Sequence, residues 1–102
     1  MMIYIDNALI SFDNQLWCHM MADSLDELHG FAAYLGISSN WFHKDARYPH
    51  YDITIQTKEN AICLGAIAVD RRQIIECGKK LKEELDSLQN QQIEQTIQLK
   101  LF

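Results

Sequence analysis

The residues best suited to chemistry lie between positions 16 and 52 of this chain of 102 residues. His19, His29 and His50 fall in that span, and Tyr51 and Asp52 follow His50 directly. Imidazole and carboxylate groups bind Zn²⁺ and similar ions, and imidazole also exchanges protons near neutral pH. The three histidines come from separate segments, so the fold has to bring them together with Asp52 to form a zinc site. A ring bonded to a carbonyl or carboxylate without any metal is the alternative.

Aspartates that follow apolar segments suggest a different metal site. Asp6, Asp23 and Asp70 each come directly after a segment with strand character. Ligands of open α/β sheets gather beyond the carboxyl ends of the strands, so these carboxylates could converge there. Asp6, Asp23, His50 and Asp52 would then hold Mg²⁺ or Mn²⁺ and support phosphate or phosphodiester chemistry. Helix capping and turn formation are the alternative roles of aspartates in such positions.

Recognition of an anion is the third chemistry that the residue types allow. Arg72 lies in the first turn of an expected helix, where free N–H groups and the helix dipole favour negative charge. A phosphate there could also contact Arg47, His19 or His50. The alternative is that Asp70 supplies the negative charge beside Arg72 and no ligand binds. Aromatic faces for stacking on a nucleotide base are available at Trp17, Trp41, Tyr48 and Tyr51.

Composition excludes several classes of protein. The net charge of −5 lacks the cationic surplus needed for tight binding to duplex nucleic acid. No apolar run approaches the ~20 residues of a membrane span, and the first residues do not form a secretion signal, so we expect a cytoplasmic protein. Three cysteines without paired spacing indicate reduced thiols. Cys18 and His19 point to opposite faces of an expected strand and cannot form a catalytic pair.

Hydrophobic patterning predicts two strands and a helix in the first third of the chain. Residues 2–5 and 16–22 have strand character, and the second segment is apolar on both faces, as a central strand is. Residues 25–35 follow as a helix, because apolar side chains recur there at helical spacing. Ser24 and Glu27 supply a capping box at its start.

The segment after this helix has weaker patterning. Trp41 and Phe42 could form a short strand or anchor a loop. Pro49 restricts the backbone before it, so we expect residues 50–52 to stand at the end of a constrained loop.

The rest of the chain alternates helices with strands. Thr54 or Thr57 caps a second helix, and residues 66–69 form a continuous apolar strand. A last helix extends from about residue 71 towards residue 90. The alternation over residues 97–101 has a strand period, and this tail could add an edge strand, pair with a second copy of the chain or be disordered.

This order of elements predicts a single α/β domain with a short, mostly parallel sheet flanked by helices. Residues 1–75 form its core, and residues 76–102 form an extension of the same domain. The extension consists of the long last helix and the tail, through which we expect a homo-oligomer. Gly78 weakens this helix by up to ~1 kcal/mol relative to alanine.

A set of short motifs spans about residues 3–75. They are Trp17-x-His19, Asp23, Glu27-Leu28-His29-x-Phe31-Ala32, Leu35-Gly36, His50-Tyr51-Asp52, Gly65-Ala66 and Arg72, with Asp6 in the opening strand. Together they resemble domain of unknown function 4031, a family of small bacterial and phage proteins. The resemblance implies no particular activity. The shared motifs point to a set of candidate site residues, which are His19, Glu27, His29, His50, Asp52 and Arg72.

The resemblance has two further implications. Longer members that are joined to a metal-dependent phosphohydrolase domain imply nucleotide or phosphate metabolism by association. Asp70 stands where the family pattern has serine, which weakens the case for a metal site built from three aspartates.

These observations rank three functions. The first is binding of a nucleotide-like or phosphorylated small ligand without catalysis, with candidate residues Trp17, His19, Glu27, His29, His50, Tyr51, Asp52 and Arg72. The second is a metal-dependent phosphoesterase or other hydrolase that uses Asp6, Asp23, His50 and Asp52. The third is an oligomeric interaction module. The expected partner is a small anionic ligand, and the cofactor to be tested is a divalent metal ion, Mg²⁺, Mn²⁺ or Zn²⁺.

Overall fold

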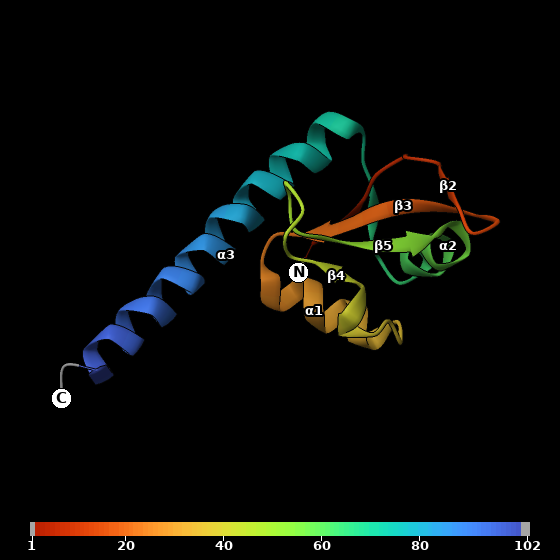
Figure 1. The fold of residues 1–102 in the computed structure, drawn as a ribbon. Coiled ribbons are helices and arrows are strands. Elements are labelled where there is room, and N and C mark those ends of the chain that lie inside the picture. The colour runs from red at the N-terminus through yellow and green to blue at the C-terminus, as the bar shows by residue number, and fades with distance from the viewer. Residues whose placement is uncertain (1, 101–102) are drawn as a thin grey trace.

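The computed structural model describes residues 2–100 and the side chains of residues 2–90. The helices are α1 (Leu25–Tyr34), α2 (Ile55–Cys63) and α3 (Arg71–Lys100), with one further helical turn at Ser39–Trp41. The strands are β1 (Ile3–Ile5), β2 (Ile10–Phe12), β3 (Gln15–Ala22), β4 (Phe42–His43), β5 (His50–Thr54) and β6 (Ile67–Ala68). One sheet forms the middle of the domain, and α3 runs from it well past its edge (Figure 1).

The sheet is mixed and mostly antiparallel. Its order is β4-β5-β3-β1-β6, with β2 also paired to β3. Among the described pairs only β1 and β6 run parallel. The prediction of an α/β domain is confirmed, but the prediction of a mostly parallel sheet was wrong. Short turns join β2 to β3 and β4 to β5, and such turns permit antiparallel pairing alone.

The first two helices each start at a residue whose side chain caps the first turn. The Ser24 hydroxyl accepts from the Glu27 N–H at 3.2 Å, which confirms the predicted N-cap of α1. The Glu27 carboxylate accepts from the Met2 N–H at 3.1 Å, so it ties the first strand to α1 and does not complete the predicted capping box. Of the two predicted caps of α2, Thr54 takes the role, because its hydroxyl accepts from the Thr57 N–H at 3.2 Å.

The last helix starts as predicted and ends later. Asp70 Oδ1 accepts from the Gln73 N–H at 2.8 Å, and Gln73 Oε1 accepts from the Asp70 N–H at 3.1 Å. Asp70 is therefore the cap of α3. The helix continues to Lys100, so the predicted edge strand over residues 97–101 was wrong for its described part, and residue 101 lies outside the described residues. No helix in the described range combines the length and the apolar character that crossing a membrane requires.

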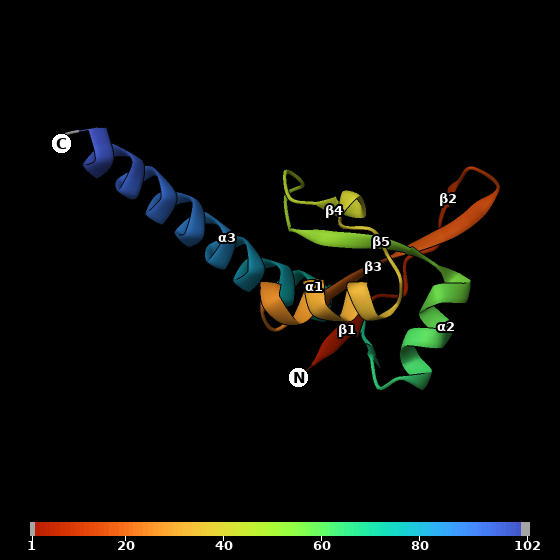
Figure 2. The same cartoon turned by 90° about the horizontal axis from the view of Figure 1, so that it is seen from below.

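Strand β3 lies at the centre of the sheet, as predicted, and its alternating side chains divide the sheet into two faces. On one face Met20 lies opposite Tyr51, and both are fully buried together with Leu28 of α1. Figure 2 shows α1 lying across the strands on this side, while α3 leaves the domain at one end. The other face carries His19 and Met21, and it is the face that holds the candidate site.

Candidate functional site

Two neighbouring strands carry the central residues of the site. Antiparallel pairing of β3 and β5 sets His19 opposite Asp52. Side chains two positions apart in a strand share a face, so His50 joins them while Tyr51 points to the α1 side. Residues 50–52 follow directly on the segment that ends at Pro49, but the prediction gave them no strand, and they begin an inner strand of the sheet.

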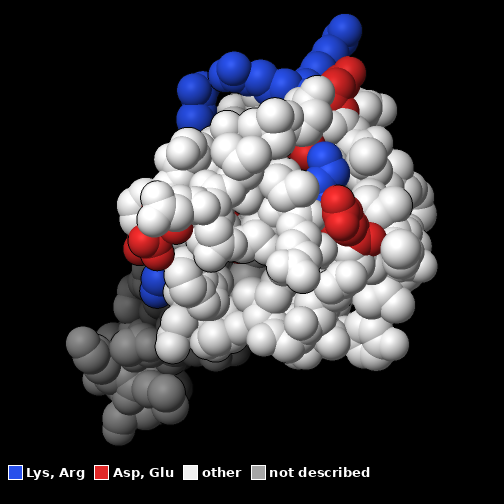
Figure 3. Space-filling view, turned by 90° about the vertical axis from the view of Figure 1, so that its right-hand side faces the viewer, with Lys and Arg blue, Asp and Glu red and all other residues white. Residues whose placement is uncertain are grey.

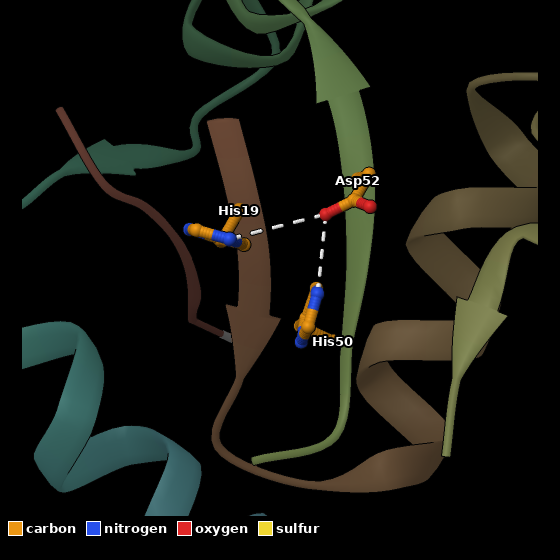
Figure 4. A group of neighbouring side chains, drawn as sticks. All are labelled: His19, His50 and Asp52. Atoms are coloured by element: carbon orange, nitrogen blue, oxygen red, sulfur yellow. Dashed lines mark ion pairs between the residues drawn. The ribbon is translucent and has the colours of Figure 1, made fainter. Parts of the chain in front are cut away.

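The Asp52 carboxylate lies close to three imidazole rings. Asp52 Oδ1 lies 3.1 Å from His50 Nε2 and 4.0 Å from His19 Nε2 (Figure 4). His43, which was not among the residues predicted for the site, places its Nε2 2.9 Å from Asp52 Oδ2. Strand β4 brings it there by pairing with β5, so that the rings of His43 and His50 stack with centroids 5.1 Å apart.

The two inner histidines are also held through their Nδ1 atoms. His19 Nδ1 lies 2.6 Å from Asp6 Oδ2, and Asp6 Oδ1 accepts from the His19 backbone N–H at 2.9 Å. His50 Nδ1 lies 2.7 Å from the carbonyl oxygen of Tyr48. Ionised carboxylates and carbonyl groups only accept hydrogen bonds, so both Nδ1 atoms carry hydrogen and both Nε2 atoms are directed towards Asp52.

These contacts shift the pKa of three groups. Burial favours a higher pKa for Asp6, but the hydrogen bonds from the ring and backbone of His19 outweigh it, and the pKa lies below its usual value. The hydrogen bond to Asp6 raises the pKa of His19 against the opposing effect of burial. Burial lowers the pKa of His50, although the Tyr48 carbonyl and Asp52 act in the opposite direction. His19 is therefore the ring of this pair that favours the charged form.

The Asp6 and His19 pair gives a pH dependence of stability that can be measured. A lowered carboxyl pKa stabilises the fold above its usual value of 3.8, and this contribution is lost as the pH falls. A raised imidazole pKa stabilises the fold below its usual value of 6.5, and this contribution is lost as the pH rises through the raised value. Urea denaturation across roughly pH 3 to 9 should therefore show the largest stability difference between the protein and Asp6→Asn between these two values. A difference that is constant across the range would contradict the assignment.

A cavity of about 720 Å³ opens beside His19 and His50. Its polar lining includes Arg47, Arg71 and, beside His19, the Asp6 carboxylate. Its apolar lining consists of Ala8, Ile10, Met21, Ala46, Ile74 and Ile75. Figure 3 shows Lys and Arg side chains gathered along the upper edge of the molecule, at the level where α3 begins in Figure 1, with acidic side chains beside some of them, while most of that face is uncharged. The cavity therefore suits a ligand that joins an anion to an apolar body.

The acidic metal site predicted from Asp6, Asp23, His50 and Asp52 is not brought together. Strands β1 and β3 are antiparallel and pair Ile3 with Ala22, so Asp23 lies beside the start of β1 whereas Asp6 lies at its end. Asp23 accepts a hydrogen bond from the Tyr4 hydroxyl at 2.9 Å. The expected convergence on one edge depended on parallel strands.

Arg72 also lies away from the cavity. It lines a smaller hollow of about 290 Å³ together with Tyr4 and Asp23. Neighbouring positions on a helix are rotated by about 100°, so Arg71 faces the cavity that His19 lines and Arg72 does not.

The remaining predicted ligand residues lie outside the cavity lining. His29 Nδ1 lies 2.8 Å from the Tyr51 hydroxyl on the α1 side of the sheet. Trp17 stacks on Trp41 with ring centroids 5.8 Å apart, and both line a second hollow that Asp52 also borders. Glu27 lies at the start of α1, where its carboxylate accepts a hydrogen bond from the Met2 N–H. The structure thus brings together His19, His50 and Asp52. It separates the two histidines from Trp17, Glu27, His29, Tyr51 and Arg72, whereas Asp52 also borders the hollow that Trp17 lines.

A family model described as a protein of unknown function (DUF4031) matches residues 3–81. The chain belongs to the DUF4031 family. The match confirms the resemblance predicted from the motifs, and it spans every strand of the sheet and the start of α3. His19, His43, His50, Asp52 and all residues that line the cavity fall inside the matched range. No curated protein and no solved structure matches the chain. Since the family description assigns no activity, the function has to be argued from the site.

Proposed function

We propose that this DUF4031 protein binds a phosphorylated small ligand of nucleotide type in the cavity beside His19. The observation that carries the proposal is that Arg47, Arg71 and the His19 ring all line one cavity of about 720 Å³. Arginine binds phosphate through charge-assisted hydrogen bonds, and Arg71 is also the first residue of α3, where free N–H groups favour an anion.

The apolar lining supports a ligand with an uncharged body. Cavities that hold small organic ligands measure about 300–1,000 Å³ and are lined mainly by apolar side chains with a few polar groups. Ile74 and Ile75 of α3 form one such wall. Tyr48 lines the cavity as well, and the Arg47 guanidinium lies 5.5 Å from its ring centroid. Tyr48 is therefore the aromatic side chain best placed to contact the ligand, in place of Trp17 and Tyr51.

Replacing Arg71 with alanine is expected to weaken ligand binding at least tenfold. Hydrogen bonds to charged groups contribute about 1.5–3 kcal/mol, which corresponds to a change in Kd of roughly ten- to a hundredfold. Isothermal titration against a panel of mononucleotides, cyclic nucleotides and ADP-ribose measures the effect.

Arg72→Ala is the matched control, because it removes the same charge from the adjacent helix position but faces another hollow. Its Kd should stay within about twofold of the unmodified protein. Equal losses in both variants, or no heat from any compound of the panel, would refute the proposal.

Hydrolysis of the bound ligand is the second candidate function. The observation that favours it is the group of His19, His50 and Asp52, whose ligand atoms all lie within 4.8 Å of one another. A metal ion held there could activate a water molecule for attack on a phosphoester. Incubation of a phosphodiester substrate with the protein and Mg²⁺, Mn²⁺ or Zn²⁺ separates the two functions, because a binding protein leaves its ligand intact. The cytoplasmic location, the phage origin and the homo-oligomer stay predictions.

A further inference from the structure

We propose that His19, His50 and Asp52 bind one divalent transition-metal ion and that His43 positions the carboxylate for it. The inference goes beyond ligand binding in the cavity, and it does not depend on that function. It rests on the distances between the side chains, on the direction of their hydrogen bonds and on the mixture of nitrogen and oxygen atoms that they present (Figure 4).

The ligand atoms already lie close to the spacing that a metal ion requires. Zn²⁺ binds imidazole nitrogen and carboxylate oxygen at about 2.0–2.2 Å, so two ligands of a tetrahedral site lie about 3.3 Å apart. Asp52 Oδ1 lies 3.1 Å from His50 Nε2 and 4.0 Å from His19 Nε2. The three ligand atoms all lie within 4.8 Å of one another, so rotations of the side chains have to bring them closer by no more than about 1.5 Å.

When both rings are neutral, the hydrogen bonds leave acceptor atoms facing one another. The Nδ1 of His50 donates to the Tyr48 carbonyl, and the Nδ1 of His19 donates to Asp6. Each neutral ring then directs an unprotonated Nε2 at Asp52 Oδ1, which is also an acceptor. A proton on one of the two rings would satisfy one of these contacts, whereas a metal ion satisfies all three atoms. Metal-bound histidines typically donate their second ring N–H to a carboxylate or a backbone carbonyl, as both rings do in this cluster.

His43 occupies the other side of the carboxylate. Its Nε2 lies 2.9 Å from Asp52 Oδ2, so it leaves Oδ1 available for the ion. Its ring also stacks on that of His50, with an angle of 19° between the planes. Because His43 touches Oδ2 of Asp52 and the face of the His50 ring, we assign it the role of a positioning residue.

The donor set selects the class of ion. Mg²⁺ and Ca²⁺ prefer ligand sets made of oxygen atoms, whereas two imidazoles and one carboxylate suit Zn²⁺ and other transition metals. Three protein ligands leave at least one coordination position free, as in catalytic zinc sites. His19 and His50 both line the cavity of about 720 Å³, so that position is accessible to a small ligand.

The test measures metal binding alone, with no phosphorylated compound present. Zn²⁺ is titrated into the metal-free protein by calorimetry, and Co²⁺ binding is followed by visible absorption, which reports the number and type of ligands. We expect one ion per chain, and a loss of affinity of at least about 100-fold in Asp52→Asn and in His50→Gln. His43→Gln should lower the affinity by about 10- to 100-fold and keep the cobalt spectrum, because a positioning residue is not a ligand.

His29→Gln is the matched control, since it removes a histidine on the other side of the sheet. Its affinity should stay within about twofold of the unmodified protein. Circular dichroism and thermal melting without metal check each variant, and His50→Gln decides the result if Asp52→Asn does not fold. Zinc binding that survives both substitutions, or that falls equally in His29→Gln, overturns the metal site. A cobalt spectrum altered by His43→Gln overturns the positioning role. Failure of zinc binding would leave the ligand proposal standing, because the titration of nucleotides is a separate experiment.

Discussion

Replacing Asp6 with alanine is expected to lower the free energy of unfolding by about 3 kcal/mol. Asp6 is 5% exposed, and its carboxylate accepts from the His19 ring, the His19 backbone N–H and the Ala8 backbone N–H. Its removal leaves those donors without a partner, and a buried group left unsatisfied costs about 1–3 kcal/mol. In a domain of this size 1 kcal/mol corresponds to about 4–8 °C, so the Tm should fall by roughly 12–24 °C.

Urea denaturation at pH 5 measures this effect where the pair contributes most, between the usual values of 3.8 and 6.5. Asp45→Ala is the control, because it removes an exposed aspartate and should change the stability by less than about 0.5 kcal/mol. An Asp6→Ala variant that unfolds like the control would show that His19 needs no partner, and the assignment of the pair would then be wrong.

Replacing Gly78 with alanine is expected to destabilise the protein by about 1–3 kcal/mol, although alanine is the better helix former. A Cβ atom at Gly78 would lie 2.6 Å from Tyr48 Cβ and 3.1 Å from Met21 Cε. The Tyr48 atom belongs to the base of its side chain and cannot turn away, so the backbone has to move. The Tyr48 carbonyl also holds His50, and its displacement should weaken metal binding as well.

Gly30→Ala is the matched control for this substitution. Gly30 lies in α1, and an added Cβ atom there meets nothing within 4 Å. Alanine should therefore stabilise the protein by about 0.5–1 kcal/mol, as helix propensity alone predicts. Chemical denaturation of the two variants should give changes of opposite sign. Stabilisation in both would show that α3 does not pack closely on Tyr48.

Features encoded within a few residues were predictable from the sequence. Ser24, Thr54 and Asp70 cap their helices because each side chain reaches an N–H group only a few positions away. The apolar character of both faces of residues 16–22 likewise indicated the central strand. These signals depend on local geometry, so they hold whatever the rest of the chain does.

Strand β5 shows why part of the site escaped prediction. The buried Tyr51 and Ile53 alternate with half-buried neighbours, and this period of two was the available signal. Pro49 directed the interpretation towards a loop, although proline also precedes strands. Strand β4 has two residues, too few for any pattern, so His43 could not be found before its pairing with β5 was known.

The sequence by itself determined the residue types of the site, the family and most helix boundaries. Only the tertiary structure decided which of these residues meet. Antiparallel pairing of β3 with β5 sets His19 against Asp52, while antiparallel pairing of β1 with β3 sets Asp23 beside the start of β1 and leaves Asp6 at its end. The direction of strand pairing depends on contacts between segments far apart in the chain, and local patterns of hydrophobicity carry no information about it.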